Sequence, residues 1–84
     1  MDKSQIQKEL KEIIAVYVPE KEILENLTLE HDLINDLKIN SAHIVDIVLD
    51  VEEKYDIMIE DEAIMKMGTI GQAIEVINGK VQKK

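Results

Sequence analysis

The sequence predicts an all-α fold: a small four-helix bundle of three longer helices and one short helix, with a long loop between helices one and two. Three observations predict it. Apolar residues recur at the three- and four-residue spacing of an amphipathic helix in three separate stretches. No stretch alternates apolar and polar residues as a half-buried strand does. A chain of 84 residues is long enough for one domain with one modest core.

The first helix is expected from Ser4 to about Val18. Ser4 and Gln7 have the spacing of a capping box, in which two side chains satisfy free backbone N–H groups at a helix start. Pro19 is expected to end the helix, because the residue before a proline is driven out of the helical conformation. The apolar stripe that should face the core consists of Ile6, Leu10, Ile13, Ile14 and Tyr17.

Residues 19–40 are predicted to form the long connection. A structureless loop of this length is unusual in a small domain, so a helical turn could form over residues 22–27 and another over 32–37. Apolar residues spread along the connection should fix it to the core: Leu27, Leu29, Leu33, Ile34 and Leu37.

The second helix is expected from about Ser41 to Tyr55 or Asp56. Asn40 is a favoured N-cap residue. Ser41 would then lie at the helix start, near free backbone N–H groups and the positive end of the helix dipole, where an anion such as phosphate is favoured. The predicted buried stripe consists of Ile44, Ile47, Val48, Val51 and Tyr55.

The remaining surface of this helix has two interpretations. Helical projection places three acidic residues on the side away from the core: Asp46, Asp50 and Glu53. Between this acidic side and the buried stripe lies an apolar strip of Ala42, Val45 and Leu49, with Glu52 and Asp56 beside it. Such a surface is either a solvated acidic face or a docking surface, in which apolar contact supplies affinity and the carboxylates steer a basic partner. Composition alone does not separate these alternatives.

A short third helix is expected over residues 60–66, with a break at Gly68. Thr69 and Gln72 again have capping-box spacing and should open a fourth helix, whose apolar stripe is Ile70, Ala73, Ile74 and Ile77. Gly79 is expected to end it. The sequence thus predicts a single domain over 1–84, structured over about 4–78, with 79–84 as a flexible basic tail.

Charge and composition exclude several classes of protein. The net charge is −8 and the pI is about 4.6, the opposite of what a nucleic-acid-binding protein shows. There is no cysteine for a zinc site or a thiolate nucleophile. No apolar run is long enough to insert into a membrane and no signal-peptide core is visible, so we expect a cytoplasmic monomer.

The two histidines, His31 and His43, were considered as ligands or bases. Neither has a partner at metal-binding spacing, and no EF-hand loop is present, so no metal site is predicted. His43 lies close to Ser41 along the chain, but a nucleophile also needs an oriented base and an oxyanion site in a cleft. We therefore expect no catalytic residues and no enzyme.

The residues from Asp36 onward resemble the acyl carrier protein family. Asp36-Leu37-Lys38-Ile39-Asn40-Ser41 is similar to the family pattern Asp-Leu-Gly-x-Asp-Ser-Leu, and the stretches 51–57 and 59–62 are similar to the family's Glu-Glu-x-Tyr/Phe-Asp-x-x-Ile-x-Asp-Glu. Thr69-Ile70 continue the likeness, which covers nearly the whole chain.

The resemblance implies a function. A phosphopantetheinyl transferase (holo-carrier synthase) would transfer 4′-phosphopantetheine from coenzyme A to Ser41, and the arm's thiol would hold acyl intermediates as thioesters for fatty-acid or a specialised lipid or polyketide-type biosynthesis. Acyl-transferring and chain-elongating enzymes with basic patches would bind in turn. By the same resemblance, the docking face would comprise Asp46, Leu49, Glu52 and Glu53, extended by Asp61 and Glu62.

The sequence departs from the family pattern around the serine. Asn40 and Ala42 replace the aspartate and leucine that flank it, His43 stands where an acid is common, and Lys38 takes the place of the glycine. Ile39 also stands where smaller residues are usual, and Glu60 replaces a common proline. These changes suggest a specialised carrier with dedicated partners.

Two alternative functions remain open at the level of the sequence. The chain could carry aminoacyl or peptidyl groups, or it could be an unmodified acidic helical interaction module. In the family, the acyl chain can fold back between the helices. A core that includes Met58, Met65 and Met67 could open for one, or these methionines could simply fill an irregular core.

Overall fold

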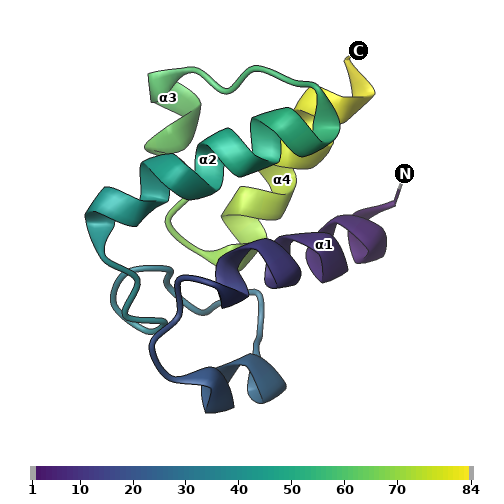
Figure 1. The fold of residues 1–84 in the computed structure, drawn as a ribbon. Helices are drawn as coiled ribbons and strands as arrows, with labels where there is room; N and C mark the ends of the chain where they lie inside the picture. The colour runs from purple at the N-terminus through teal and green to yellow at the C-terminus, as the bar shows by residue number, and fades with distance from the viewer. Residues whose placement is uncertain (1, 84) are drawn as a thin grey trace.

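The computed structural model describes residues 2–83, and every regular element in that range is a helix. The elements are α1 (Lys3–Ala15), the 3₁₀ helix η1 (Lys21–Asn26), α2 (Ser41–Tyr55), α3 (Asp61–Ile64) and α4 (Ile70–Gln82). Figure 1 shows α1, α2 and α4 as the three long helices, with the single turn of α3 beside α2. The predicted all-α bundle of three longer helices and a short one is confirmed, with η1 as an additional helical segment.

The ends of α1 differ from the prediction. Asp2 caps the helix, its Oδ1 accepting a hydrogen bond from the Gln5 N–H at 2.9 Å, so the predicted Ser4–Gln7 capping box is wrong. The helix ends at Ala15 rather than near Val18. Lys21 Nζ donates to the carbonyl oxygens of Ala15 and Val18, so a cation satisfies acceptors left free at this helix end before Pro19 is reached.

The start of α4 is as predicted and its end is not. Thr69 and Gln72 form the expected capping box. The expectation that Gly79 ends the helix is wrong, since α4 continues to Gln82. Packing of Val81 against the core and two hydrogen bonds from Lys80 to the Glu60 carboxylate, at 2.8 and 2.9 Å, stabilise the last turn and outweigh the poor helix propensity of glycine.

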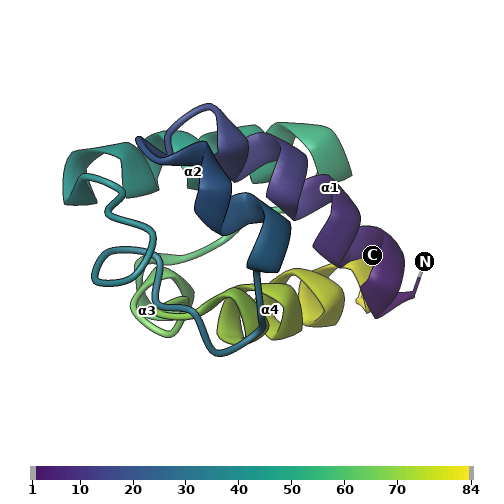
Figure 2. The same ribbon diagram turned by 90° about the horizontal axis from the view of Figure 1, so that it is seen from below.

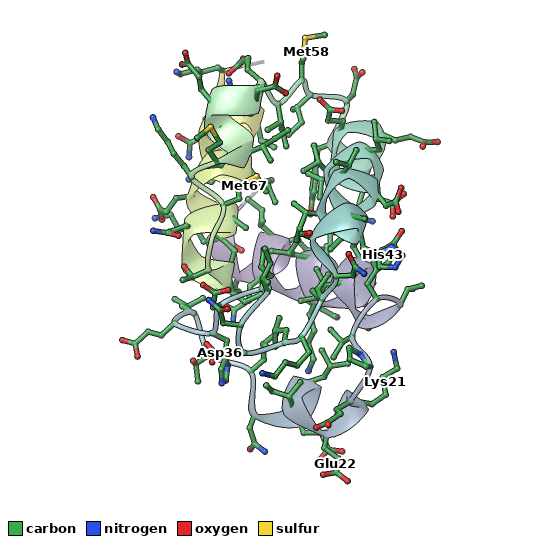
Figure 3. All side chains as sticks on the ribbon, turned by 90° about the vertical axis from the view of Figure 1, so that its left-hand side faces the viewer. Lys21, Glu22, Asp36, His43, Met58 and Met67 are labelled. Atoms are coloured by element: carbon green, nitrogen blue, oxygen red, sulfur yellow. The ribbon has the colours of Figure 1, made fainter. Side chains whose placement is uncertain are left out.

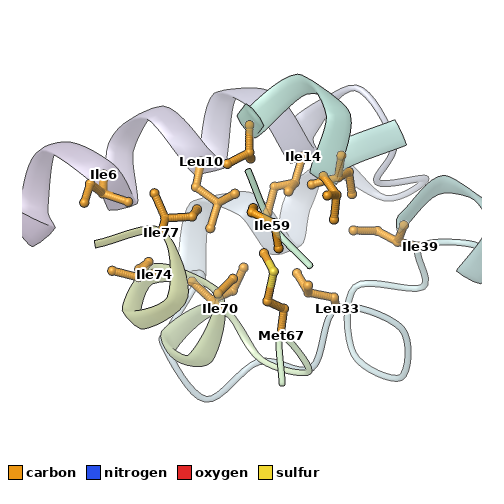
Figure 4. Close-up of a cluster of buried hydrophobic side chains, with 14 of the residues drawn as sticks. Ile6, Leu10, Ile14, Leu33, Ile39, Ile59, Met67, Ile70, Ile74 and Ile77 are labelled. Carbon is orange, nitrogen blue, oxygen red and sulfur yellow. The ribbon is translucent and has the colours of Figure 1, made fainter. Parts of the chain in front are cut away.

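The core lies where the long helices meet. Ile6, Leu10 and Ile14 of α1 face the side chains of α4, as the close-up in Figure 4 shows. From α4, α2 and the connection, the buried side chains include Ile70, Ala73, Ile74, Ile77, Ile47, Val48, Val51, Tyr55, Leu33, Leu37 and Ile39. The predicted stripes are thus confirmed, except that Ile13, Tyr17 and Ile44 are only partly buried against this core.

The methionines behave differently from one another. Met67 is buried, whereas 76% of Met58 and 85% of Met65 is exposed. The suggestion that all three contribute to the core is therefore wrong for Met58 and Met65. Met58 lies in the loop after α2 and Met65 caps α3, a helix of four residues that covers little of the core. Figure 3 shows Met58 at the periphery and Met67 inside.

The connection between α1 and α2 is fixed mainly by backbone hydrogen bonds to the start of α4. Asp32 and Thr69 form an isolated antiparallel bridge, and the Leu33 N–H donates to the Gly68 carbonyl at 3.0 Å. The Gly71 N–H donates to the Leu29 carbonyl at 2.8 Å, and a Cβ at Gly71 would lie only 3.1 Å from that oxygen. Figure 2 shows the connection passing from the end of α1 across to α4 and on to α2.

The two helical turns considered for the connection have separate outcomes. The first is present as η1, and the second is a hydrogen-bonded turn rather than a helix, in which the N–H groups of Asp36 and Leu37 both donate to the Asp32 carbonyl at 3.0 Å. Leu29 and Ile34 are about half exposed, so they do not anchor the connection as expected. No helix among residues 2–83 has the length and apolar character needed to cross a membrane.

Candidate functional site

Ser41 is the first residue of α2, and its side chain is exposed. Asn40 caps the helix as predicted: its Oδ1 accepts from the Ala42 N–H at 2.9 Å, and its carbonyl accepts from the His43 N–H at 2.8 Å. Because Asn40 performs the capping, the Ser41 hydroxyl is left open to solvent at the positive end of a 15-residue helix.

Burial on both sides fixes the backbone just before this serine. Leu37 and Ile39 are each 1% exposed, and the Ile39 N–H donates to the Leu33 carbonyl at 3.2 Å. Lys38 lies between them with φ of 59°, in the left-handed region that favours glycine. The two buried neighbours hold the lysine in this unfavourable conformation, and they thereby fix the direction in which α2 starts.

Two aspartates close the preceding turn. Asp32 Oδ1 accepts from the N–H groups of Asn35 and Ile34, at 2.8 and 2.9 Å, and these backbone hydrogen bonds lower the pKa of Asp32 below its ordinary value. Asp36 Oδ2 accepts from the Asp32 N–H at 2.7 Å; Figure 3 labels Asp36 in this loop. Asp36 therefore stabilises the loop that presents Ser41.

One side of α2 exposes both apolar and acidic side chains. Val45 and Leu49, one turn apart, are 56% and 55% exposed, and the carboxylates of Asp46 and Glu53 are exposed beside them. Asp61 and Glu62 are exposed in the first turn of α3. The apolar strip predicted from the helical projection is therefore present at the surface and is not used by the core.

Glu52 differs from the other acidic residues of α2. It is only partly exposed, and its Oε2 accepts a hydrogen bond from the Ile59 N–H at 2.7 Å. This bond ties the loop after α2 back to the helix. Sequence reasoning missed it, because nothing in the local pattern shows that the backbone returns to Glu52 seven residues later.

His43 makes two contacts near Ser41 that the sequence did not predict. Its ring centroid lies 5.2 Å from that of Tyr17 in the turn after α1, and its Nδ1 lies 3.3 Å from Asp46 Oδ2. The Tyr17 hydroxyl donates to Asp50 Oδ2 at 3.1 Å; partial burial and this hydrogen bond raise the pKa of Tyr17 above its ordinary value. Among residues 2–83, no hydrogen bond joins His43 to Ser41.

The other histidine has a local role. His31 Nδ1 accepts from the Thr28 N–H at 2.9 Å and so stabilises a turn of the connection. Within the part of the chain that the structure describes, no group of three or more histidine, aspartate or glutamate side chains is placed to hold a metal ion.

Comparison with known proteins decides the family. The family model described as a phosphopantetheine attachment site matches residues 4–77. The chain is 32% identical to the acyl carrier protein of Coprothermobacter proteolyticus over 84 residues, which is 100% of both chains. It is 35% identical to the acyl carrier protein of Exiguobacterium sp. over 81 residues, 96% of this chain and 100% of the relative. This chain belongs to the acyl carrier protein family.

A third acyl carrier protein, from Buchnera aphidicola, is 32% identical over 80 residues, 93% of this chain and 96% of the relative. Acyl carrier proteins are carriers rather than catalysts, and their cofactor is covalently attached 4′-phosphopantetheine. They interact with a phosphopantetheinyl transferase and with biosynthetic enzymes. This carrier therefore holds acyl groups on a phosphopantetheine arm.

The residues at the start of α2 fit this cofactor. Ser41 offers an exposed hydroxyl, α2 has no acidic side chain in its first turn, and a helix N-terminus favours the phosphate of the arm. When attached, the arm supplies the thiol to which the acyl group is bound. The chain has no cysteine, so that thiol is not supplied by its own side chains.

Proposed function

We propose that Ser41 is the residue to which the 4′-phosphopantetheine arm is attached. The observation that carries this proposal is the exposed Ser41 hydroxyl at the first residue of α2, inside the segment matched by the family model. Only one other serine occurs in the sequence, Ser4, which lies on α1. Fixed burial of Leu37 and Ile39 gives the attached arm a defined starting point.

Partner enzymes are proposed to bind the exposed side of α2. We define the docking face as Asp46, Leu49 and Glu53 of α2 with Asp61 and Glu62 of α3. Leu49 supplies apolar contact, and the carboxylates, together with a net charge of −8, attract basic patches on the transferase and on acyl-transferring and chain-elongating enzymes. Glu52, which the resemblance also assigns to the docking face, supports this face indirectly. Its carboxylate accepts a hydrogen bond from the Ile59 N–H and so ties the loop after α2 to the helix.

A proposal for the pathway can be based on the residues that surround Ser41. We propose a cytoplasmic carrier for fatty-acid biosynthesis or a specialised lipid or polyketide-type pathway. Asn40, Ala42 and His43 are all at or near the surface that a partner meets, and they replace residues that the family pattern has there. These departures favour the specialised pathway, which predicts slow loading by general fatty-acid synthase enzymes.

Intact-protein mass spectrometry tests the attachment point. The protein is incubated with coenzyme A and a phosphopantetheinyl transferase that accepts many carriers. The expected result is a gain of one phosphopantetheine in the wild type and in Ser4→Ala, and no gain in Ser41→Ala. Retention of the gain in Ser41→Ala, or no gain in the wild type, would overturn the assignment. Because Asn40 supplies the cap, Ser41→Ala should keep its helical content.

A charge reversal tests the docking face. Glu53→Lys should raise the KM of the transferase for the carrier about tenfold, as expected when a steering carboxylate becomes a repelling cation. Glu25→Lys is the matched control, since it changes the net charge equally at an exposed position on η1. Equal effects of the two variants would show that only the net charge matters and that α2 holds no specific face.

A further inference from the structure

His43 and its neighbours form a side-chain cluster near Ser41 that joins α2 to the turn following α1. The cluster comprises Tyr17 of that turn and His43, Asp46 and Asp50 of α2. Figure 3 shows His43 at the outer surface of α2 rather than in the core. His43 and Asp46 side chains are about half exposed, at 48% and 53%, so their contact excludes little water.

The exposure of the pair limits what it can do for stability. A hydrogen bond or ion pair between exposed side chains contributes little to the free energy of folding. The contact nevertheless restricts the rotation of the Asp46 carboxylate, because Oδ2 lies 3.3 Å from His43 Nδ1, while the Asp46 side chain remains 53% exposed. The carboxylate is therefore held in place while one oxygen stays open to a basic partner.

The histidine is itself held by the turn that follows α1. Its ring packs against Tyr17 with an interplanar angle of 36°, and the Tyr17 hydroxyl is fixed by its hydrogen bond to Asp50. Groups that face His43 are thus the phenol of Tyr17 from this turn and the carboxylates of Asp46 and Asp50 from α2. This chain of contacts connects the turn, which is outside the docking face, to the docking carboxylate closest in sequence to Ser41.

We infer that His43 is a positioning residue: packed against Tyr17, it holds the Asp46 carboxylate in the orientation that a basic partner enzyme binds. The inference rests on the proposed function, since it concerns the recognition step that precedes transfer to Ser41. Immobilising a side chain upon binding opposes association, so a carboxylate that is already oriented lowers KM and leaves the chemical step unchanged.

Two substitutions separate the two contacts of the histidine. His43→Phe keeps a ring that can pack on Tyr17 but removes the donor to Asp46. His43→Asn removes the ring but places an amide N–H close to the position of Nδ1. The KM and kcat of the transferase are measured with each variant as the varied substrate and coenzyme A in excess, together with the thermal unfolding midpoint.

We expect His43→Phe to raise KM about three- to fivefold, the range set by ordering one side chain on binding. His43→Asn keeps a donor to Asp46 but loses the packing on Tyr17, so its KM should rise less than that of His43→Phe, with kcat and the unfolding midpoint unchanged in both variants. An unchanged KM in His43→Phe, or an equal rise in His43→Asn, would overturn the inference.

A double-mutant cycle shows whether the effect acts through Asp46. In an Asp46→Asn background the further change His43→Phe should leave KM unaltered, whereas in the matched Glu53→Gln background it should still raise KM about three- to fivefold. An undiminished effect in Asp46→Asn would show that His43 does not act through Asp46. Absence of any transfer to the wild type would instead overturn the proposed function itself, and the inference with it.

Discussion

Two tyrosines make the same kind of bond between α2 and the N-terminal part of the chain, in very different surroundings. At the last residue of α2, Tyr55 is 7% exposed and its hydroxyl donates to Glu9 Oε1 of α1 at 2.6 Å. Tyr17 is partly exposed in the turn that follows α1; its ring lies against His43 near the start of α2, and its hydroxyl donates to Asp50 in the second half of that helix at 3.1 Å. The Tyr55 contact is buried and anchors the end of the helix, whereas the Tyr17 contacts can be replaced by water or a partner.

The backbone shows the same contrast. A non-glycine residue in the left-handed region flanks each end, Lys38 with φ of 59° and Asp56 with φ of 55°. Asp56 caps the helix, and the N–H groups of Asp56 and Ile57 both donate to the Glu52 carbonyl. Aspartate tolerates this conformation better than lysine does. Strain is therefore concentrated at the functional end, where the burial of Leu37 and Ile39 imposes it.

Removal of each tyrosine ring should give the largest difference between the two ends. Tyr55→Ala is expected to lower the free energy of unfolding by about 3 kcal/mol, because it empties a buried site. Tyr17→Ala should cost clearly less, since this ring is only partly buried. Urea denaturation followed by circular dichroism measures both. Equal losses would contradict the view that the Tyr55 contact anchors α2 more firmly than the Tyr17 contacts do.

Removal of the hydroxyl groups alone is the sharper comparison. Tyr55→Phe should cost about 1 kcal/mol, as expected for one side-chain hydrogen bond in partly buried surroundings. Tyr17→Phe should cost less, because its bond to Asp50 is exposed to solvent. The same urea titrations apply. A larger loss in Tyr17→Phe would show that the start of α2 is the more firmly held end.

Glycine substitution tests the backbone strain at each end. Lys38→Gly should raise the free energy of unfolding by about 0.5 kcal/mol, the left-handed penalty of lysine less the added entropy of a glycine in the unfolded chain. Asp56→Gly should gain less, since aspartate is better suited to this conformation and its side chain has interactions to lose. Thermal unfolding of both variants, compared with the wild type, measures these changes in stability. A destabilised Lys38→Gly would mean that the lysine side chain outweighs its backbone strain.

The smallest expected effect is a pH dependence specific to the buried end. The hydrogen bond from Tyr55 holds the pKa of Glu9 below its ordinary value of 4.5. This bond therefore contributes stability above pH 4.5, which is lost as the pH falls through the lowered pKa of the folded state. Tyr55→Phe should weaken the acid dependence of the unfolding midpoint, whereas Tyr17→Phe should leave it unchanged. If the unfolding midpoint depends on pH identically in both variants, the bond between Tyr55 and Glu9 does not cause the acid dependence.

Local patterns gave reliable predictions where the signal was local. The stripes of α1, α2 and α4, the Asn40 cap and the Thr69–Gln72 capping box are all confirmed, because helical periodicity and capping involve residues within a few positions of one another. The incorrect predictions about helices concern their ends: Asp2 rather than Ser4 caps α1, and α4 continues past Gly79 because Lys80 and Val81 make contacts outside the helix. The others concern burial, since Met58, Met65, Leu29 and Ile34 are exposed.

The sequence by itself determined the helices, the aliphatic core and the position of Ser41 at the start of α2, since each follows from spacing along one segment. Only the tertiary structure decided that Tyr17 lies against His43, that Glu52 bonds to Ile59, and that the connection pairs with the start of α4. The first and last of these contacts join residues far apart in the chain, and the Glu52–Ile59 bond joins residues seven positions apart across a loop. They depend on how helices and loops pack against one another, which helical periodicity does not specify.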